Sequence, residues 1–324
     1  MSKDRAAGPE PRWARTAIGL FALSVVACAM FGVFEQKARP ASPYAHLTAM
    51  PVVHGTNGIA FQAVHLPGGH DARVIWIYTP PHPPGQRLPC VFIAPDSATG
   101  YYGKALYPVN QREQWPYAKA GFVVVAYSVD GSTTDLNSNE VVTGIERFRA
   151  AHCGVDNERA AVDYALANLP YVDPKRLYVA GHSSGGTMAL MAASHDPRIA
   201  GCVVYAPACD VRTRVNRLGA LEMALRVPGF ESFLTTCSPI EYTSTLRCPV
   251  FLFHADNDGN VPRSDVETYL AKLRRTNANV VYSRVPLGGH LVALFTDGLP
   301  RGIAWLKKLS GMATNGSDQS RKAS

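Results

Sequence analysis

The chain of 324 residues contains 47% hydrophobic and 18% charged residues, a composition typical of a globular protein that buries a full core. Its net charge of +7 comes from scattered basic residues that do not alternate with aromatic ones, whereas nucleic-acid-binding proteins gather basic residues on one face. We therefore expect no nucleic-acid partner and interpret the basic groups as solvated surface. The densest of these groups are Arg212/Arg214/Arg217 and Lys272/Arg274/Arg275.

An uncharged segment near the N-terminus, residues 16–34, is close to the roughly 20 residues that an α-helix needs to cross a bilayer. Four basic residues precede it, which predicts a cytoplasmic N-terminus (residues 1–15) and an extracytoplasmic location for the remainder. Two alternatives stay open: a cleaved signal peptide, or lipidation at Cys28, because Val25-Val26-Ala27-Cys28 loosely resembles a lipobox. Residues 29–34 remain apolar where a mature N-terminus usually turns polar, which favours an uncleaved signal anchor.

The rest of the chain divides into three parts by composition. Residues 35–55 have the character of a linker, residues 56–310 alternate strand-like with helix-like segments, and residues 311–324 are polar and expected to be disordered. Within the long central part, residues 131–156 look like an inserted helix and loop. Residues 208–248 form a second insertion, which we expect to be a small helical cap.

Eight segments of the central part have the composition of β-strands. They are 61–65, 73–79, 90–94, 122–127, 176–180, 201–205, 250–254 and 280–285. Several are short and continuously apolar, as in strands buried on both faces of a parallel sheet; the first two alternate, as an antiparallel edge hairpin would. Amphipathic helices separate the strands. The pattern predicts an α/β fold with a mainly parallel eight-stranded sheet flanked by helices.

The first candidate catalytic residue is Ser183, in the motif Gly181-His182-Ser183-Ser184-Gly185. A G-x-S-x-G motif alone is weak evidence, but here a buried strand runs into it and a helix leaves it. This strand–turn–helix context is that of a nucleophile elbow, in which a sharp turn exposes the serine side chain. Gly181 and Gly185 suit such a turn because they have no Cβ to collide where helix and strand pass closely. The alternative is a Gly/Ser connection without chemistry.

A serine nucleophile needs a base, and the base needs a third group that fixes its tautomer. His290 lies in Gly288-Gly289-His290, directly after the last predicted strand, where a glycine-rich loop can place an imidazole over the sheet edge. The carboxylate is expected after the strand at 250–254, where Asp256 and Asp258 are both candidates. Spacing does not separate the two, since either could be an ordinary turn residue.

Together these segments resemble the dienelactone-hydrolase and prolyl-oligopeptidase-like branch of the α/β-hydrolases. The matching segments are Tyr171–Arg176, Gly181–Gly186, Cys248–His254, Asp258–Pro262 and Gly288–His290. The resemblance spans about residues 60–310 and implies the α/β-hydrolase fold. In that family the triad carboxylate is the Asp of an Asp-x-x-Val-Pro pattern, which here is Asp258, so the resemblance favours Asp258 over Asp256.

The resemblance also implies an oxyanion hole made of two backbone N–H groups. One should be that of Ser184, the residue after the nucleophile. The other usually comes from a His-Gly-Gly-like segment after the third strand, but this chain has Ala94-Pro95-Asp96-Ser97 there. Pro95 has no N–H, so Asp96, or else its neighbour Ser97, is the expected donor, with the Asp96 side chain pointing away from the oxyanion.

These residues predict a serine hydrolase that acts on a small-molecule ester through a Ser183–His290–Asp258 triad, with neither metal nor organic cofactor. An ester is the expected substrate because the sequence shows no propeller of the kind that prolyl-oligopeptidase-like proteins carry. Two alternatives remain: a peptidase or other amide hydrolase, and a membrane-anchored binding module without catalysis. The arginines at 212, 214 and 217 could favour acidic substrates, although a solvated surface is the other interpretation. The oligomeric state is left open.

The seven cysteines fit either an oxidising or a reducing compartment. Those at predicted strand edges behave as small buried hydrophobes: Cys90, Cys202 and Cys248. Cys153, Cys209 and Cys237 fall in predicted loops and could pair if the domain is exported, with Cys209–Cys237 as the pair considered first. Six candidates outside the N-terminal segment allow 15 connectivities, so the sequence does not assign bridges.

Overall fold

A computed structural model describes residues 53–313, apart from residues 55, 70, 97–99 and 134–138. The segment predicted to be a signal anchor, nearly all of the linker and most of the polar tail therefore lie outside the described residues. Among the residues that are described, no helix combines the length and the apolar character needed to span a membrane.

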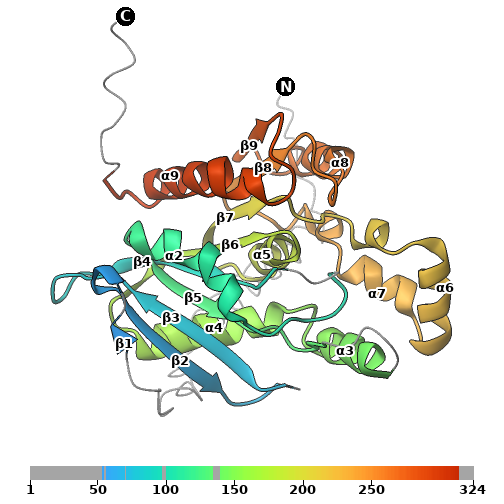
Figure 1. The fold of residues 1–324 in the computed structure, drawn as a ribbon, viewed down its shortest axis with the longest axis horizontal. Helices are drawn as coiled ribbons and strands as arrows, with labels where there is room; N and C mark the ends of the chain where they lie inside the picture. Colours follow the sequence, from blue (N-terminus) through green and yellow to red (C-terminus); the bar gives the residue numbers. More distant parts are fainter. Residues whose placement is uncertain (1–52, 55, 70, 97–99, 134–138, 314–324) are drawn as a thin grey trace, which may run out of the picture. The chain divides into compact units, whose positions relative to one another are not determined.

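The described residues form one sheet with nine strands in the order β1-β2-β3-β5-β4-β6-β7-β8-β9 (Figure 1). The strands are β1 (Val53–His54), β2 (Ala60–Leu66), β3 (Arg73–Thr79), β4 (Leu88–Ile93), β5 (Val123–Tyr127), β6 (Val172–His182), β7 (Ile199–Tyr205), β8 (Val250–Ala255) and β9 (Val280–Val285). The eight predicted strands are all present. The two-residue strand β1 was not predicted; it pairs with β2 at the edge of the sheet.

The predicted mixture of strand directions is confirmed. Strands β1, β2 and β3 run antiparallel to their neighbours, and β5, β4, β6, β7, β8 and β9 run parallel. The continuously apolar strands β4, β5 and β8 are buried at every residue, because helices cover both faces of the sheet. In register, Ala180 of β6 lies between Ile93 of β4 and Val203 of β7. The loops after these strands therefore meet at one edge of the sheet.

Helices pack on both faces of the sheet. They are α2 (Gln111–Lys119), α3 (Asn139–Ala150), α4 (Val155–Asn168), α5 (Ser184–His195), α6 (Arg217–Arg226), α7 (Phe230–Thr236), α8 (Arg263–Leu273) and α9 (Leu299–Leu309). Short helical turns are η1 (Thr56–Gly58), η2 (Pro108–Asn110), η3 (Val211–Arg214), η4 (Pro239–Tyr242) and η5 (Leu294–Gly298). Buried residues of α2 and α9 join one apolar cluster, and those of α4, α5 and α8 join the other.

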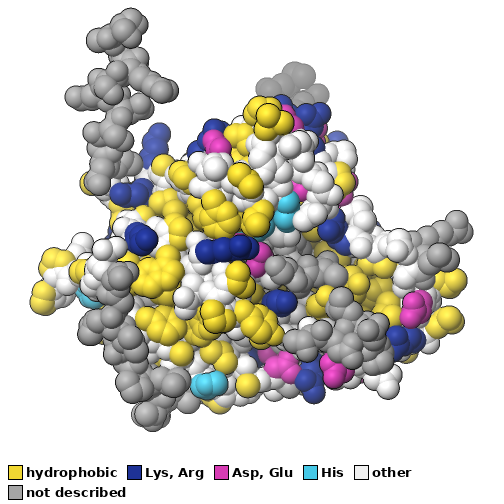
Figure 2. All heavy atoms as spheres, viewed as in Figure 1, with side chains coloured by type: hydrophobic (Ala, Val, Ile, Leu, Met, Phe, Trp, Pro, Cys, Tyr) yellow, Lys and Arg dark blue, Asp and Glu magenta, His cyan; other side chains and the backbone are white. Residues whose placement is uncertain are grey.

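Two helical insertions interrupt the alternation of strand and helix (Figure 1). Helix α3 follows β5, and the segment between β7 and β8 contains η3, α6, α7 and η4, which form the cap. Phe230, Phe233 and Leu234 of α7 are buried in the same cluster as α4 and α5, so the cap packs on the core through this helix. On the face drawn in Figure 2, Lys and Arg side chains are dispersed among hydrophobic and neutral ones.

Candidate active site

Ser183 lies in the turn between β6 and α5, as the elbow motif predicts. Its backbone has φ 54° and ψ −124°, a conformation that non-glycine residues rarely adopt. Its N–H donates a hydrogen bond to the Tyr205 carbonyl of β7 at 2.9 Å, which ties the turn to the neighbouring strand. Ser183 is partly exposed, whereas His182 and Ser184 on either side are buried. The turn therefore presents one serine to solvent at the carboxyl edge of the sheet.

The glycines of the motif allow this sharp turn. A Cβ on Gly181 would overlap the carbonyl oxygen of Gly185, and a Cβ on Gly185 would lie 2.7 Å from the Ala94 carbonyl oxygen. Real Cβ atoms essentially never approach a backbone oxygen this closely. Both glycines are therefore required for steric reasons: the first lets α5 pass close to β6, and the second lets the segment after β4 reach the elbow.

His290 and Asp258 lie together, as the triad hypothesis expects. His290 Nδ1 is 2.8 Å from Asp258 Oδ2, and the other oxygen of Asp258 accepts hydrogen bonds from the N–H groups of Asn260 and Val261 at 2.8 and 3.0 Å. The Asp258 side chain is 0% exposed. Burial alone would raise the pKa of Asp258, but these hydrogen bonds outweigh burial and hold its pKa below the usual value. Asp258 is thus an anion that fixes the Nδ1 side of the imidazole.

Asp256 has a different environment. Its carboxylate lies 3.3 Å from Arg284 Nε and 3.7 Å from Arg263 Nη1, and its side chain is partly exposed. It therefore belongs to a surface ion-pair group. Between the two candidates that spacing left open, the structure brings Asp258 to His290 and directs Asp256 to arginines.

The loop that carries His290 is held at two further points. Asn257 Oδ1 accepts a hydrogen bond from the Gly289 N–H at 2.9 Å, and His182 Nε2 lies 3.0 Å from the His290 carbonyl oxygen. The rings of His182 and His290 are 4.6 Å apart between centroids. Because His182 directly precedes Ser183 in the chain, these contacts place His290 beside the elbow.

His182 is a site residue that the sequence interpretation missed. Its ring is buried below the elbow, and Nδ1 faces Glu113 Oε1 at 3.4 Å and Asp96 Oδ2 at 3.7 Å. Burial alone would lower the pKa of His182, but the two carboxylates raise it to about 9. The sequence feature that could have identified it is the position of a histidine directly before the elbow serine. Nothing in the sequence indicated that Glu113 would reach this histidine.

Asp96 lies where the oxyanion segment was predicted. The Pro95 carbonyl carbon is 3.3 Å from the position that a Gly185 Cβ would take, so the Pro95–Asp96 peptide lies against the first turn of α5. The Asp96 carboxylate is directed to Asn110, whose Nδ2 donates to it at 2.9 Å, and towards His182. Ser184 begins α5, and backbone N–H groups at a helix N-terminus point towards an approaching anion. The two donors remain predictions, and the alternative, Ser97, lies outside the described residues.

Asp96, Glu113 and His182 each offer one ligand atom, and these atoms lie within 4.8 Å of one another. An ion pair of His182 with the two carboxylates accounts for these contacts. His182 Nε2 faces a carbonyl oxygen and Nδ1 faces two carboxylates, and these surroundings favour the protonated ring. Arg112 adds further positive charge 4.0 Å from Asp96. We assign no metal, and the expectation that catalysis needs none stays a prediction.

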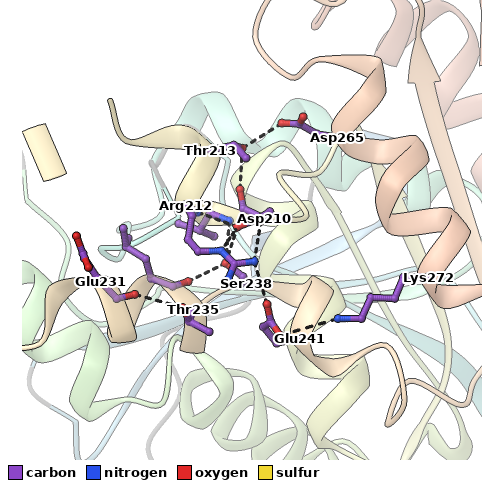
Figure 3. Close-up of polar contacts among 11 residues, drawn as sticks. Asp210, Arg212, Thr213, Glu231, Thr235, Ser238, Glu241, Asp265 and Lys272 are labelled. Carbon is purple, nitrogen blue, oxygen red and sulfur yellow. Dashed lines mark hydrogen bonds and ion pairs between the residues drawn. The ribbon is translucent and has the colours of Figure 1, made fainter. Parts of the chain in front are cut away.

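Polar contacts join the base of the cap to the core (Figure 3). Arg212 donates from Nε and Nη2 to the Asp210 carboxylate, both at 2.8 Å, and from Nη2 to Glu241 Oε1 at 2.9 Å. Thr213 Oγ1 donates to Asp265 Oδ2 of α8 at 3.0 Å. Arg212 therefore forms ion pairs within the protein. These contacts favour neither of the two interpretations considered for this residue, the binding of an acidic substrate and a solvated surface.

Arg214 also has a partner inside the protein. Its guanidinium donates to the carbonyl oxygen of Asn260, in the turn whose backbone binds Asp258. The first turn of the cap is thus connected to the loop of the candidate triad carboxylate.

The cysteine pairing considered first is wrong in this structure. Cys237 lies against Cys153, with 3.0 Å between the sulfur atoms, whereas Cys209 Sγ faces the Pro207 carbonyl oxygen at 3.7 Å. The sequence could not show this, because the contact depends on how α7 packs on the turn between α3 and α4.

The strand order, the serine elbow after β6 and a histidine–aspartate pair after β9 and β8 define the molecule as a serine hydrolase of the α/β-hydrolase fold. Residues 109–311 match the model of the prolyl oligopeptidase family, Peptidase_S9, and the chain belongs to this family.

Relatives of known name agree with this class. An acetyl esterase of Xylanibacter ruminicola is 27% identical over 170 residues, 45% of this chain and 38% of the relative. A protein of Yersinia pestis named as a carboxymethylenebutenolidase is 25% identical over 221 residues, 64% of this chain and 74% of the relative. The chain thus spans less than half of the first relative. A solved puromycin-hydrolysing peptidase of Mycobacterium tuberculosis has the same fold, with a TM-score of 0.65, 20% identity, and coverage of 82% of this chain and 41% of that one.

Proposed function

We propose that the protein hydrolyses carboxylic esters, with Ser183 as nucleophile, His290 as base and Asp258 as the group that orients the base. The observation that carries the proposal is the 2.8 Å contact between His290 Nδ1 and the fully buried Asp258, in a loop that His182 holds beside the elbow. This contact leaves Nε2 of His290 as the nitrogen available to the serine.

In the proposed reaction, His290 Nε2 removes the Ser183 proton while Ser183 Oγ attacks the ester carbonyl carbon. Asp258 stabilises the imidazolium that forms, and the tetrahedral oxyanion accepts hydrogen bonds from the N–H groups of Ser184 and Asp96. His290 then transfers its proton to the leaving alcohol, and an acyl-enzyme remains on Ser183. Water, deprotonated by His290, attacks this acyl group and releases the carboxylic acid.

The surroundings of His290 favour an apolar acyl or alcohol group in the substrate. Three large hydrophobic side chains flank it in the sequence and are exposed: Leu287 at 71%, Leu291 at 40% and Val292 at 62%. Apolar surface that is exposed next to reactive groups is typical of binding sites. The names of the two relatives, an acetyl esterase and a carboxymethylenebutenolidase, support ester-type substrates.

A fluorophosphonate probe tests the nucleophile. We expect the full chain to be labelled and Ser183→Ala not to be, with the exposed Ser264→Ala as a matched control that labels like the wild type. A folded wild-type protein that never labels would support the alternative of a binding module without catalysis.

A substrate panel tests the reaction class. 4-Nitrophenyl esters of increasing acyl length are compared with 4-nitroanilides of short peptides, and we expect kcat/KM to be higher for the esters by at least tenfold. Membership of the prolyl oligopeptidase family favours the second candidate, a peptidase. Preference for the anilides, lost in Ser183→Ala, would establish that candidate instead.

We also propose that residues 16–34 anchor the protein in a membrane with the hydrolase domain on the extracytoplasmic side. The uncharged length of this segment and the basic residues before it support the proposal. N-terminal sequencing of the mature protein tests it: a start at Cys28 or later would show cleavage and replace the anchor with a secreted or lipid-anchored form.

A further inference from the structure

Two cysteines far apart in the sequence meet where the cap packs on the core. Cys153 lies in the turn between α3 and α4, and Cys237 directly follows α7 of the cap as its C-cap residue. Their sulfur atoms are 3.0 Å apart, although 84 positions separate the residues. Both side chains are almost completely buried, at 1% and 0% exposure. Two sulfur atoms at this separation need to approach by only about 1 Å to reach the disulfide bond length of roughly 2.05 Å.

The turn that carries Cys153 has an unusual backbone. His152, Cys153 and Gly154 have φ values of 50°, 55° and 83°, so three residues in succession lie in the left-handed region. Such a conformation is natural for Gly154 but unfavourable for the other two. The N–H of Cys153 donates to the Phe148 carbonyl at 3.0 Å, which closes the end of α3. The turn thus holds Cys153 towards α7, and His152 and Cys153 adopt an unfavourable backbone conformation in it.

We propose that Cys153 and Cys237 form a disulfide bond that links the cap to the core. Each cysteine loses one proton and the pair loses two electrons, and a small disulfide oxidant is reduced to two thiols. In the two-step exchange, the Cys153 thiolate first attacks one sulfur of the oxidant and displaces the first thiolate. The Cys237 thiolate then attacks Cys153 Sγ, forms the Cys153–Cys237 bond and displaces the second.

A cavity borders this pair on the side of Cys153. It has a volume of about 470 Å³, and its walls include Cys153, Phe233 and Arg149. The Arg149 guanidinium lies 4.6 Å from the centre of the Phe233 ring. Burial raises the pKa of the Cys237 thiol, while the charge of Arg149 acts in the opposite direction. Cys153, which borders the cavity, is therefore the thiol that meets the oxidant first, and Cys237 closes the bond.

Two other buried cysteines face backbone carbonyl oxygens. Cys202 Sγ faces the Ala189 carbonyl oxygen at 3.6 Å, and Cys209 Sγ faces that of Pro207 at 3.7 Å. The Cys153–Cys237 bond would close a loop that contains β6, the elbow, α5, β7 and most of the cap. Closing a long loop restricts the unfolded chain, so the bond should stabilise the domain and hold α7 against α3 and α4. This inference does not depend on the proposed reaction.

The test uses the full chain in a glutathione buffer, oxidising or reducing. After alkylation of free thiols, mass spectrometry of peptides should show Cys153 joined to Cys237 in the oxidised sample only, with the other cysteines alkylated. The temperature of unfolding should be several degrees higher for the oxidised protein. Cys237→Ser should abolish this difference, and Cys209→Ser, the matched control, should keep it.

Two results would overturn the proposal. One is full alkylation of both cysteines, after denaturation, in protein that was equilibrated with oxidised glutathione. The other is a bond from Cys237 to any cysteine other than Cys153. Because both readouts come from the wild-type chain, they remain informative even where a serine variant fails to fold.

Discussion

Two histidines stand side by side at the elbow, and each faces carboxylates, yet their environments differ. His290 contacts one carboxylate, Asp258, through Nδ1, and 15% of its side chain is exposed. His182 is 2% exposed, and its Nδ1 faces two carboxylates, those of Glu113 and Asp96. The two histidines therefore differ in the number of carboxylates that they face and in their access to solvent.

The buried histidine supports the exposed one. Through its Nε2, His182 contacts the His290 backbone carbonyl at 3.0 Å, so the buried ring helps to position the loop that carries the proposed base. A protonated imidazole is a suitable support because it donates at both nitrogens. Changes at the His290–Asp258 pair should therefore alter catalysis. Changes at the buried cluster of His182, Glu113 and Asp96 should alter stability and, through the loop that carries His290, catalysis as well.

The largest expected effect is at the His290–Asp258 pair. Asp258→Asn should lower kcat by about 10⁴-fold, because the imidazole would lose the anion that fixes its tautomer and stabilises its charged form. Steady-state kinetics on the best ester of the panel measure this, with urea unfolding to show that the variant is folded. A loss below tenfold would mean that Asp258 is not the triad carboxylate.

The next largest effect is expected in the buried cluster of His182, Glu113 and Asp96, and it is an effect on stability. His182→Phe would leave Asp96 and Glu113 buried beside each other without the imidazolium, and should lower the free energy of unfolding by about 3–5 kcal/mol. In the double variant His182→Phe/Glu113→Gln one of these charges is absent, so part of the loss should be recovered. Equal stability of single and double variants in urea titrations would contradict the assigned ion pair.

The contributions of His182 and Asp258 to the stability of the fold should also depend on pH in opposite directions. The folded pKa of His182 is raised to about 9 from about 6.5, so its stabilisation is complete below pH 6.5 and is lost as pH rises through 9. Asp258, whose pKa is lowered, stabilises the fold above about pH 4 and loses this contribution as pH falls through its folded value. At about 1.4 kcal/mol per pKa unit, the His182 contribution is at most about 3–4 kcal/mol. Urea unfolding at pH 6 and pH 9.5, with His182→Gln as reference, measures it.

The smallest effect is at the neighbouring acid. Asp256→Asn removes a partly exposed carboxylate that contacts two arginines, and exposed ion pairs contribute about 0–1 kcal/mol. We expect a change in kcat below threefold and little change in stability. A greater loss of activity here than in Asp258→Asn would reverse the assignment of the triad carboxylate.

The sequence predicted the sheet well because its central strands are buried on both faces and read as continuous apolar runs. Ser183 and His290 could be proposed because each follows a recognisable strand, and the strand at 250–254 narrowed the carboxylate to Asp256 or Asp258. The resemblance to the prolyl-oligopeptidase-like branch then favoured Asp258. The cluster around His182 could not be proposed, since Glu113 lies on α2 and reaches the elbow only through tertiary packing. The same holds for the Cys153–Cys237 contact. The two-residue strand β1 is too short to leave a pattern in the sequence.

The backbone of Ser183 has a consequence for how this protein can be improved. Its positive φ, 54°, is a conformation that glycine adopts freely and that costs other residues about 1–3 kcal/mol. The proposed nucleophile therefore stands at a point where activity and stability are in direct conflict. A selection for thermal stability alone would favour Ser183→Gly. That variant would be more stable but would lack the proposed nucleophile. Any search for stable variants needs a simultaneous selection for turnover.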